Sequence, residues 1–281
     1  MKRPLLLSLM AVALVMPAAG RATSGADVTR TVYFSAIDAK GVPVTDLTAA
    51  DLSVKENGKD RAIAGLEAAT TPLFVSVLVD DAGSGAFQGP VAQMMERILP
   101  HGVFAVRVMN PQPTKLTDFT ADRATLQTAI GNMGPRGRVQ TAGDQMMDAV
   151  QDAARELQQK KAARAAIIIL TVGGETAQSN QAGPALDAVK ASGASLSVVY
   201  VAGLELGQVL GDGPKRSGGT SEQITGGVVP GPLLAKIAEN LMHQYMLTYT
   251  LPDGVKPNER FALSTSRKGI TLLAPTRIPD K

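Results

Sequence analysis

The sequence contains no cysteine and no tryptophan, and only two of its 281 residues are histidine. Without cysteine, a disulfide framework, a zinc site built on thiolates and a lipid attached to an N-terminal cysteine are all excluded. Two histidines leave few ligands for metal chemistry based on imidazole. Aromatic residues make up only 4% of the chain, whereas 44% of it is hydrophobic. This composition suits an α/β core filled by valine, alanine and leucine.

Charge of one sign is not in large excess, because 28 basic residues face 25 acidic ones. The high isoelectric point therefore does not indicate nucleic-acid binding. The glycines after residue 211 do not precede a helix at the spacing of a phosphate-binding loop, so the sequence gives no support for nucleotide binding.

Residues 1–22 have the pattern of a secretory signal peptide. Lys2 and Arg3 precede an apolar run from Leu5 to Val15, and small residues follow it. That run is about 11 residues long, which is short of the roughly 20 that a helix needs to span a bilayer. We expect cleavage near residue 22, a periplasmic or secreted mature protein, and no stable transmembrane segment.

The middle of the chain has the alternation of strands and helices that is typical of an α/β protein. Apolar runs at 73–79, 103–108, 166–170 and 196–201 alternate with helical patterns near 88–99, 121–133, 143–160 and 182–192. This order predicts, over residues 71–204, a doubly wound and mainly parallel sheet that is covered by helices on both faces.

Both ends of the mature chain are rich in β-structure signals. Alternating apolar residues and the Asn57-Gly58 turn predict strands over residues 30–70, and a second alternation predicts strands over 245–275. The two segments are expected to pair as a smaller β lobe. After the main domain, residues 205–231 are predicted to be a Gly-, Pro- and Ser-rich surface loop. Residues 232–244 are predicted to form a closing helix before the C-terminal strands.

Ligands of a doubly wound sheet bind beyond the carboxyl ends of its strands, and the first such end reads Asp80-Asp81-Ala82-Gly83-Ser84. This segment resembles the metal-site motif Asp-x-Ser-x-Ser of von Willebrand factor A domains, with Ala82 in place of the first serine. The family completes its oxygen site for Mg²⁺ or a related ion with a threonine before a later helix and an aspartate at the end of the fourth strand.

Two further segments resemble those parts of the family's motif. Gly143-Asp144 stands where the family has Gly-Thr, and Leu170-Thr171-Val172-Gly173-Gly174 is similar to Leu-Thr-Asp-Gly. The resemblance therefore implies a degenerate metal-ion-dependent adhesion site, because Val172 offers no oxygen to a hard cation.

The flanking segments are similar to a group of exported bacterial proteins related to von Willebrand factor A. The leader from Asp38 to Gly58, the Thr225-Gly226-Gly227 element and the aromatic strand from Tyr245 to Tyr249 follow that group's order. The resemblance covers nearly all of residues 30–275. It implies a von Willebrand factor A-like fold with an attached β lobe.

The same residues support a functional and a purely structural interpretation. Asp80, Ser84 and Asp144 would be the oxygen ligands of a remodelled Mg or Ca site. Alternatively, Asp80 ends a strand, and Thr141 with Asp144 caps a helix and faces its dipole.

A serine hydrolase is a competing hypothesis, because Ser84 lies between small residues at a strand-to-helix turn, as in a nucleophile elbow. Its histidine would have to be His101 or His243. His101 would precede the acid, against the order serine, acid, histidine, and His243 falls at the end of a predicted helix.

The sequence favours an exported protein-binding module of the adhesion type, without catalytic residues and without a metal cofactor. Its partner would be another exported or envelope protein, contacted by loops on the rim of the sheet. The rim residues predicted to take part are Asp81, Arg136, Arg138, Thr141, Gly173 and Gly174.

Overall fold

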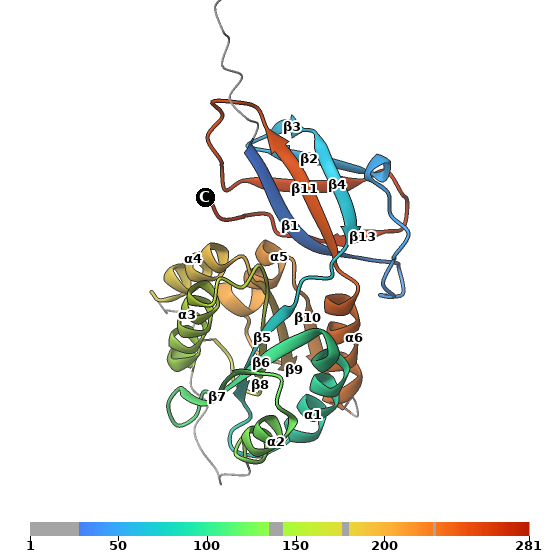
Figure 1. Ribbon diagram of the computed structural model, residues 1–281. Helices are drawn as coiled ribbons and strands as arrows, with labels where there is room; N and C mark the ends of the chain where they lie inside the picture. Colours follow the sequence, from blue (N-terminus) through green and yellow to red (C-terminus); the bar gives the residue numbers. More distant parts are fainter. Residues whose placement is uncertain (1–27, 135–142, 176–179, 227–228, 281) are drawn as a thin grey trace, which may run out of the picture.

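A computed structural model describes residues 28–134, 143–175, 180–226 and 229–280. The signal segment 1–22 lies outside these residues. Two lobes are stacked in the molecule: a larger α/β lobe and a smaller β lobe (Figure 1). No helix in the described part of the chain is long and apolar enough to cross a membrane.

The α/β lobe is built on a six-stranded sheet with the order β10-β9-β8-β5-β6-β7. Five of these strands are parallel, and β7 pairs antiparallel with β6 at one edge. The strands are β5 (Leu73–Asp80), β6 (Gly102–Val108), β7 (Thr114–Thr120), β8 (Arg164–Thr171), β9 (Ser195–Val201) and β10 (Ser221–Ile224). The strand order reverses between β5 and β8, which defines a doubly wound sheet.

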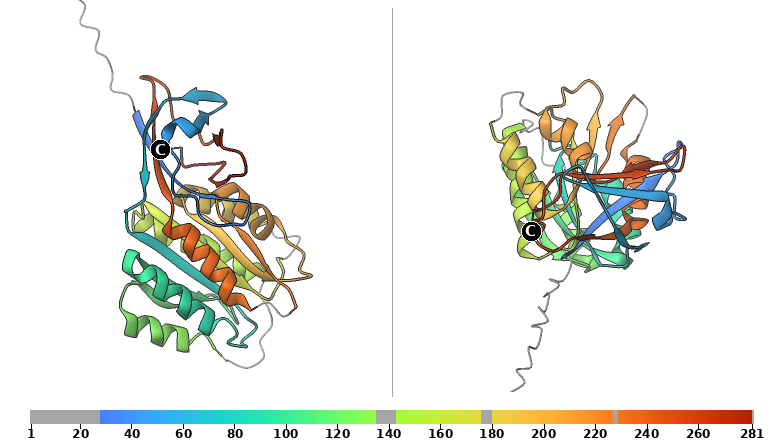
Figure 2. Two further views of the ribbon diagram at one scale, coloured as in Figure 1. Left: turned by 90° about the vertical axis from the view of Figure 1, so that its right-hand side faces the viewer. Right: turned by 90° about the horizontal axis from the view of Figure 1, so that it is seen from above.

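Helices cover both faces of this sheet (Figure 2). The helices are α1 (Gln88–Ile98), α2 (Arg123–Gly131), α3 (Gly143–Gln159), α4 (Ala182–Ser192), α5 (Gly213–Ser217) and α6 (Pro230–Met242). Alternate residues of the central strands point to opposite faces. Val77 and Ile168 therefore pack with α1, α2 and α6, whereas Ile167 and Ile169 pack with α3 and α4. The expected α/β architecture is confirmed.

The β lobe joins the two ends of the chain. One sheet has the order β13-β1-β11-β4, and a second has the order β12-β2-β3. The strands are β1 (Val28–Ile37), β2 (Leu52–Glu56), β3 (Lys59–Arg61), β4 (Ile63–Ala68), β11 (Tyr245–Leu251), β12 (Phe261–Thr265) and β13 (Thr271–Leu273). β1 and β11 pair antiparallel from Val28↔Leu251 to Phe34↔Tyr245. The smaller β lobe therefore contains strands from both terminal segments.

The segment 205–231 was predicted to be a surface loop, and the structure corrects this. It contains a π-helical turn, η3 (Gln208–Asp212), the helix α5, and β10, which adds a parallel strand to the main sheet beside β9. Its glycines permit close packing. A Cβ on Gly219 would lie 1.9 Å from the Leu196 carbonyl oxygen, and one on Gly213 would lie 2.6 Å from Leu196 Cδ2.

Arg164 connects the two lobes at the start of β8. Only 3% of the residue is exposed. Its guanidinium donates to the carbonyl oxygens of Ala69 and Thr71, in the link between β4 and β5, at 3.0 and 3.2 Å. It also donates to Gln244 Oε1 at 2.9 Å and to the Leu241 carbonyl oxygen. Burial lowers the pKa of this guanidinium.

Candidate functional site

The carboxyl ends of β5 and β8 meet at the point where the strand order reverses. Asp80 ends β5 opposite Thr171, which ends β8. In doubly wound sheets this crevice is the usual position of a ligand. It lies at the end of the sheet that is remote from the β lobe, in the lower part of Figure 1.

Asp80 is 1% exposed and its carboxylate is held by neighbouring side chains. Asn110 Nδ2 donates to Oδ1, and the Thr171 hydroxyl lies 3.2 Å from Oδ2. Thr171 is itself fixed, because its hydroxyl accepts the Gly173 N–H at 2.9 Å and lies 2.7 Å from the Gly173 carbonyl oxygen. Both oxygens of Asp80 are therefore engaged within the protein.

Asp81 shapes the loop that follows β5. Its carboxylate accepts the N–H groups of Gly83 and Gly85 at 2.9 and 2.7 Å. These bonds support a backbone with positive φ at Ala82 (52°) and Gly83 (75°). Asp81 was predicted to contact a partner, but with 1% of the residue exposed it positions the loop instead. An aspartate carboxylate commonly accepts the backbone N–H two residues further along the chain, and this hydrogen bond stabilises a turn.

Ser84 is exposed, and its Oγ accepts the Ala86 N–H at 3.2 Å. Asp80, by contrast, is buried at the end of its strand. The backbone of Asp144 lies in the first turn of α3; its side chain is outside the described part of the chain. Arg136, Arg138 and Thr141 also lie outside the described residues.

The end of β8 carries an apolar side chain where the resembled motif has an aspartate. Val172 packs against the core formed with α1, α2 and α6, and its N–H donates to the Asp80 carbonyl oxygen at 2.8 Å. Gly173 is buried and Gly174 is half-buried. Of the two glycines predicted to lie on the rim, Gly174 is therefore the one with a surface that a partner could contact.

Two buried residues that organise this edge were not identified from the sequence. Asn110 lies two residues after β6 and donates to Asp80, and an Asn-Pro pair close after a buried strand was the available signal. The carboxylate of Glu175 accepts the N–H groups of Val209 and Leu210 at 3.1 and 2.9 Å, and so caps η3. Its partners lie more than thirty positions away, so no local pattern identifies it.

The described residues at this edge do not by themselves form a site for a hard divalent cation. Asp80 is hydrogen-bonded through both oxygens, Val172 has no donor atom, and Glu175 is occupied by backbone N–H groups. Among the described residues, no cluster of three or more histidine, aspartate or glutamate side chains could hold a metal ion.

The geometry separates Ser84 from both histidines. Ser84 follows the carboxyl end of β5, whereas His101 directly precedes the amino end of β6, which is parallel to β5. His243 lies beyond α6, next to the residues that contact the start of β8. β5 has 8 residues and thus spans roughly 25 Å. A hydrogen-bonded Ser84–His pair therefore cannot form in this fold.

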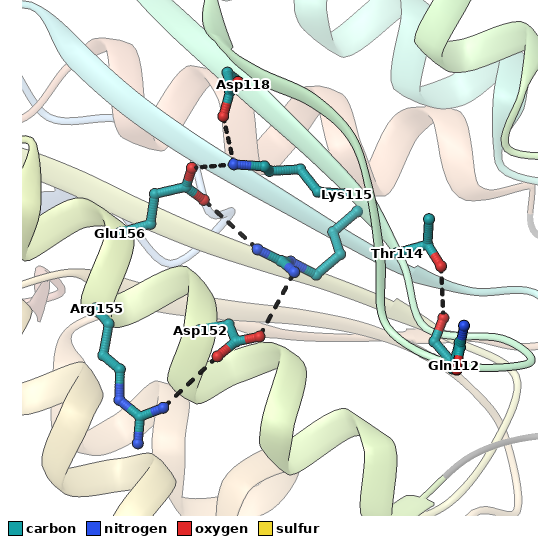
Figure 3. Close-up of polar contacts among 8 residues, drawn as sticks. Gln112, Thr114, Lys115, Asp118, Asp152, Arg155 and Glu156 are labelled. Carbon is teal, nitrogen blue, oxygen red and sulfur yellow. Dashed lines mark hydrogen bonds and ion pairs between the residues drawn. The ribbon is translucent and has the colours of Figure 1, made fainter.

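A network of charges fixes α3, whose first turn lies at this edge, to the strands β6 and β7 (Figure 3). Arg107 Nη1 lies 3.7 Å from Asp152 Oδ2, and Arg107 Nη2 lies 3.6 Å from Glu156 Oε2. Lys115 Nζ lies 2.9 Å from the other carboxylate oxygen of Glu156, Oε1. Hydrogen bonds to Asp118 and then to Glu156 raise the pKa of Lys115. These ion pairs therefore attach the second half of α3 to the edge of the sheet.

Comparison with known proteins gives structural likenesses only. No family model matches the sequence, and no curated protein matches it significantly. The chain is similar to the VWA domain of SpRpn10, with 12% identity and a TM-score of 0.48 over 61% of this chain and 97% of that one.

It is also similar to the conserved hypothetical protein BatB from Bacteroides thetaiotaomicron, with 14% identity and a TM-score of 0.47 over 60% of this chain and 97% of that one. A third similar structure is a von Willebrand factor type A protein from Catenulispora acidiphila, with 12% identity and a TM-score of 0.48 over 90% and 73% of the two chains. The doubly wound architecture is established by the chain's own strand order and flanking helices.

Proposed function

We propose that this chain is an exported von Willebrand factor A-like module that binds another protein through the rim beyond β5 and β8, without catalysis and without a metal ion. The signal-like segment 1–22 supports export to the periplasm or beyond, and the motifs around Asp80 and Thr171 support the family relationship. Loops on a rigid sheet are the usual place for recognition.

The state of Asp80 is the observation that carries this proposal. Asn110 and Thr171 hydrogen-bond to both carboxylate oxygens of Asp80, so a cation at this position would have to share or displace these contacts. The apolar Val172 removes the second carboxylate of the motif. These two features support recognition by the surface of the rim rather than through a cation.

A metal-dependent adhesion module is the alternative, with Mg or Ca held by Asp80, Ser84 and Asp144. Thermal unfolding separates the two. An ion at about 100 times its dissociation constant would add roughly 2.7 kcal/mol to the stability of the fold. We expect the melting temperature to be the same in chelator and in millimolar Mg²⁺, Ca²⁺ or Mn²⁺. A rise that Asp80→Ala abolishes would favour the metal-dependent module.

The rim itself is tested by capturing proteins from an envelope extract on the immobilised chain, in chelator and in Mg²⁺. The double variant Arg136→Glu, Arg138→Glu should weaken the capture of a specific partner in both buffers. The matched control, Lys59→Glu with Lys268→Glu, makes the same charge change at exposed positions of the β lobe and should retain capture. Equal capture by both variants would argue against this rim.

A further inference from the structure

The first half of β1 has a strand partner on one side only. Residues Val28 to Phe34 pair with β11, whereas β13 pairs with β1 only at Ser35–Ile37. Within the described part of the chain, the other edge of β1 is therefore open over about seven residues. In Figure 1 this edge is the side of the upper sheet that faces α4 and the C-terminal segment.

The hydrogen bonds of the next strand show which backbone groups face the open edge. The Gln244 carbonyl accepts the Ala69 N–H, and the Thr250 N–H donates to the Ala62 carbonyl. Even-numbered residues of β11 therefore bond toward β4, and odd-numbered ones bond toward β1. Tyr249 lies opposite Arg30 and Leu247 opposite Val32, so even-numbered β1 residues bond to β11.

It follows that Thr29, Thr31 and Tyr33 direct their N–H and C=O groups outward from the sheet. Three alternate residues offer a donor and an acceptor each, in the arrangement that another extended backbone matches. Open edges of this kind are templates for an added strand.

A cavity of about 320 Å³ adjoins this edge, between the two lobes. Thr29 to Tyr33 form one wall, the end of α4 and Ser195 form another, and the C-terminal segment from Pro275 to Pro279 forms a third. Ser195 is 8% exposed, and its Oγ has no hydrogen-bond partner among the described residues. An unsatisfied buried hydroxyl of this kind can be satisfied by a ligand group.

The charged side chains that line the cavity are mostly basic. Arg30, Lys190, Arg216 and Arg277 contribute to the lining, against the single acid Asp187. Arg30 is neutralised by Glu56 at 3.0 Å. Lys190 and Arg277 share the carboxylate of Glu259, at 2.6 and 3.0 Å, and Arg216 lies 3.5 Å from Asp212. Arg216 and Arg277 have side chains that are 47% and 48% exposed, so they can turn toward an anionic group.

We propose that the open edge of β1 binds a short extended segment of a partner polypeptide, which adds a strand beside Thr29 to Tyr33 and places a carboxylate near Arg216 and Arg277. The backbone array requires an extended peptide, because no compact small molecule matches alternating donors and acceptors along a strand. This site lies at the opposite end of the α/β sheet from the rim, so it does not depend on the proposed rim function.

A random heptapeptide library displayed on phage is the probe, selected on the purified protein. We expect enriched sequences in which Val, Ile or Thr alternate with Asp or Glu. An enriched peptide, added to isotope-labelled protein, should shift the amide resonances of Thr29, Thr31 and Tyr33 and slow their hydrogen exchange. The same peptide with one inward-facing amide N-methylated loses a strand hydrogen bond, and should bind roughly tenfold more weakly.

Variants of the protein test each part of the site. Thr31→Pro removes an outward N–H while keeping the β11 ladder, since proline is tolerated on such an edge. The second variant, Arg216→Gln with Arg277→Gln, removes two charges and their ion pairs with Asp212 and Glu259; because these side chains are 47% and 48% exposed, the protein should still fold. Each should weaken binding by roughly tenfold or more, while Arg155→Gln, on the exposed face of α3, should not.

The outcomes are distinct. Loss of binding in both site variants and in the N-methylated peptide would establish strand addition. The proposal is overturned if no sequence is enriched, if enriched peptides leave the three amides unchanged, or if the N-methylated peptide binds equally well. Unchanged binding in the rim variants of Arg136 and Arg138 would show that this site works independently of the rim.

Discussion

At the scale of single residues, Arg164 makes four long-range hydrogen bonds that the sequence alone does not reveal. Replacing it with methionine should cost roughly 2–4 kcal/mol of unfolding free energy, because the carbonyl oxygens of Ala69, Thr71 and Leu241 lose a charged donor inside the protein. Urea unfolding of Arg164→Met measures this loss. The control Arg155→Met, at a side chain that is 59% exposed, should change stability by less than about 0.5 kcal/mol. Equal losses would contradict this role.

The candidate site shows what residue patterns can and cannot predict. Asp80 was placed at the end of a buried strand because an apolar run stops there, and the structure agrees. The partners of its carboxylate could not be predicted, because Asn110 and Thr171 lie 30 and 91 positions away. Asp81 was predicted to lie on the partner-binding rim, because it follows the carboxyl end of a strand. Its burial depends on the turn that its own side chain stabilises.

At the scale of elements, Gly219, just before β10, packs closely against the backbone of β9. Gly219→Ala should destabilise the fold by about 1–3 kcal/mol, since the new Cβ would lie 1.9 Å from the Leu196 carbonyl oxygen. Gly226→Ala is the matched control, because nothing lies within 4 Å of its Cβ position. Thermal unfolding of both variants is the measurement. Similar melting temperatures would mean that β10 is only loosely attached.

Strong periodicity decided which elements could be predicted. α3 and the four central strands β5, β6, β8 and β9 have long apolar patterns, and the sequence located them within a few residues. The edge strands β7 and β10 were missed for physical reasons. β7 (Thr114–Thr120) is polar and stabilised by side-chain charges such as Lys115, and β10 has four residues between glycines. Their strand character comes from tertiary pairing, which a local pattern does not contain.

At the scale of the whole molecule, the two proposed binding surfaces lie near opposite ends of the six-stranded sheet. The rim lies beyond the carboxyl ends of β5 and β8, and the open edge of β1 lies beside the amino end of β9. The β lobe is joined to the α/β lobe through Arg164 and through the ion pair of Lys190 with Glu259. A partner bound at the β1 edge would contact both lobes and would therefore stabilise their present arrangement.

The ion pair of Lys190 with Glu259, which connects the two lobes, predicts how the stability of the protein depends on pH. The hydrogen bond from Lys190 lowers the pKa of Glu259 below its usual 4.5, and the same bond raises the pKa of Lys190 above 10.5. The stabilisation from Glu259 is present above pH 4.5 and is lost as the pH falls through its lowered pKa. The stabilisation from Lys190 is present below pH 10.5 and is lost as the pH rises through its raised pKa.

Glu259→Gln should therefore lower the melting temperature most between about pH 5 and pH 10, and the difference from the wild type should shrink toward pH 2. Melting curves of both proteins across this range provide the measurement. Asp253→Asn removes an exposed carboxylate of the same lobe and serves as the control for general charge effects. A difference that stays constant from pH 7 to pH 2 would show that Glu259 acts through packing and not through its charge. If the difference instead follows the titration, the charge pair helps to hold the wall of the cavity in place, since Lys190 and Arg277 both line it.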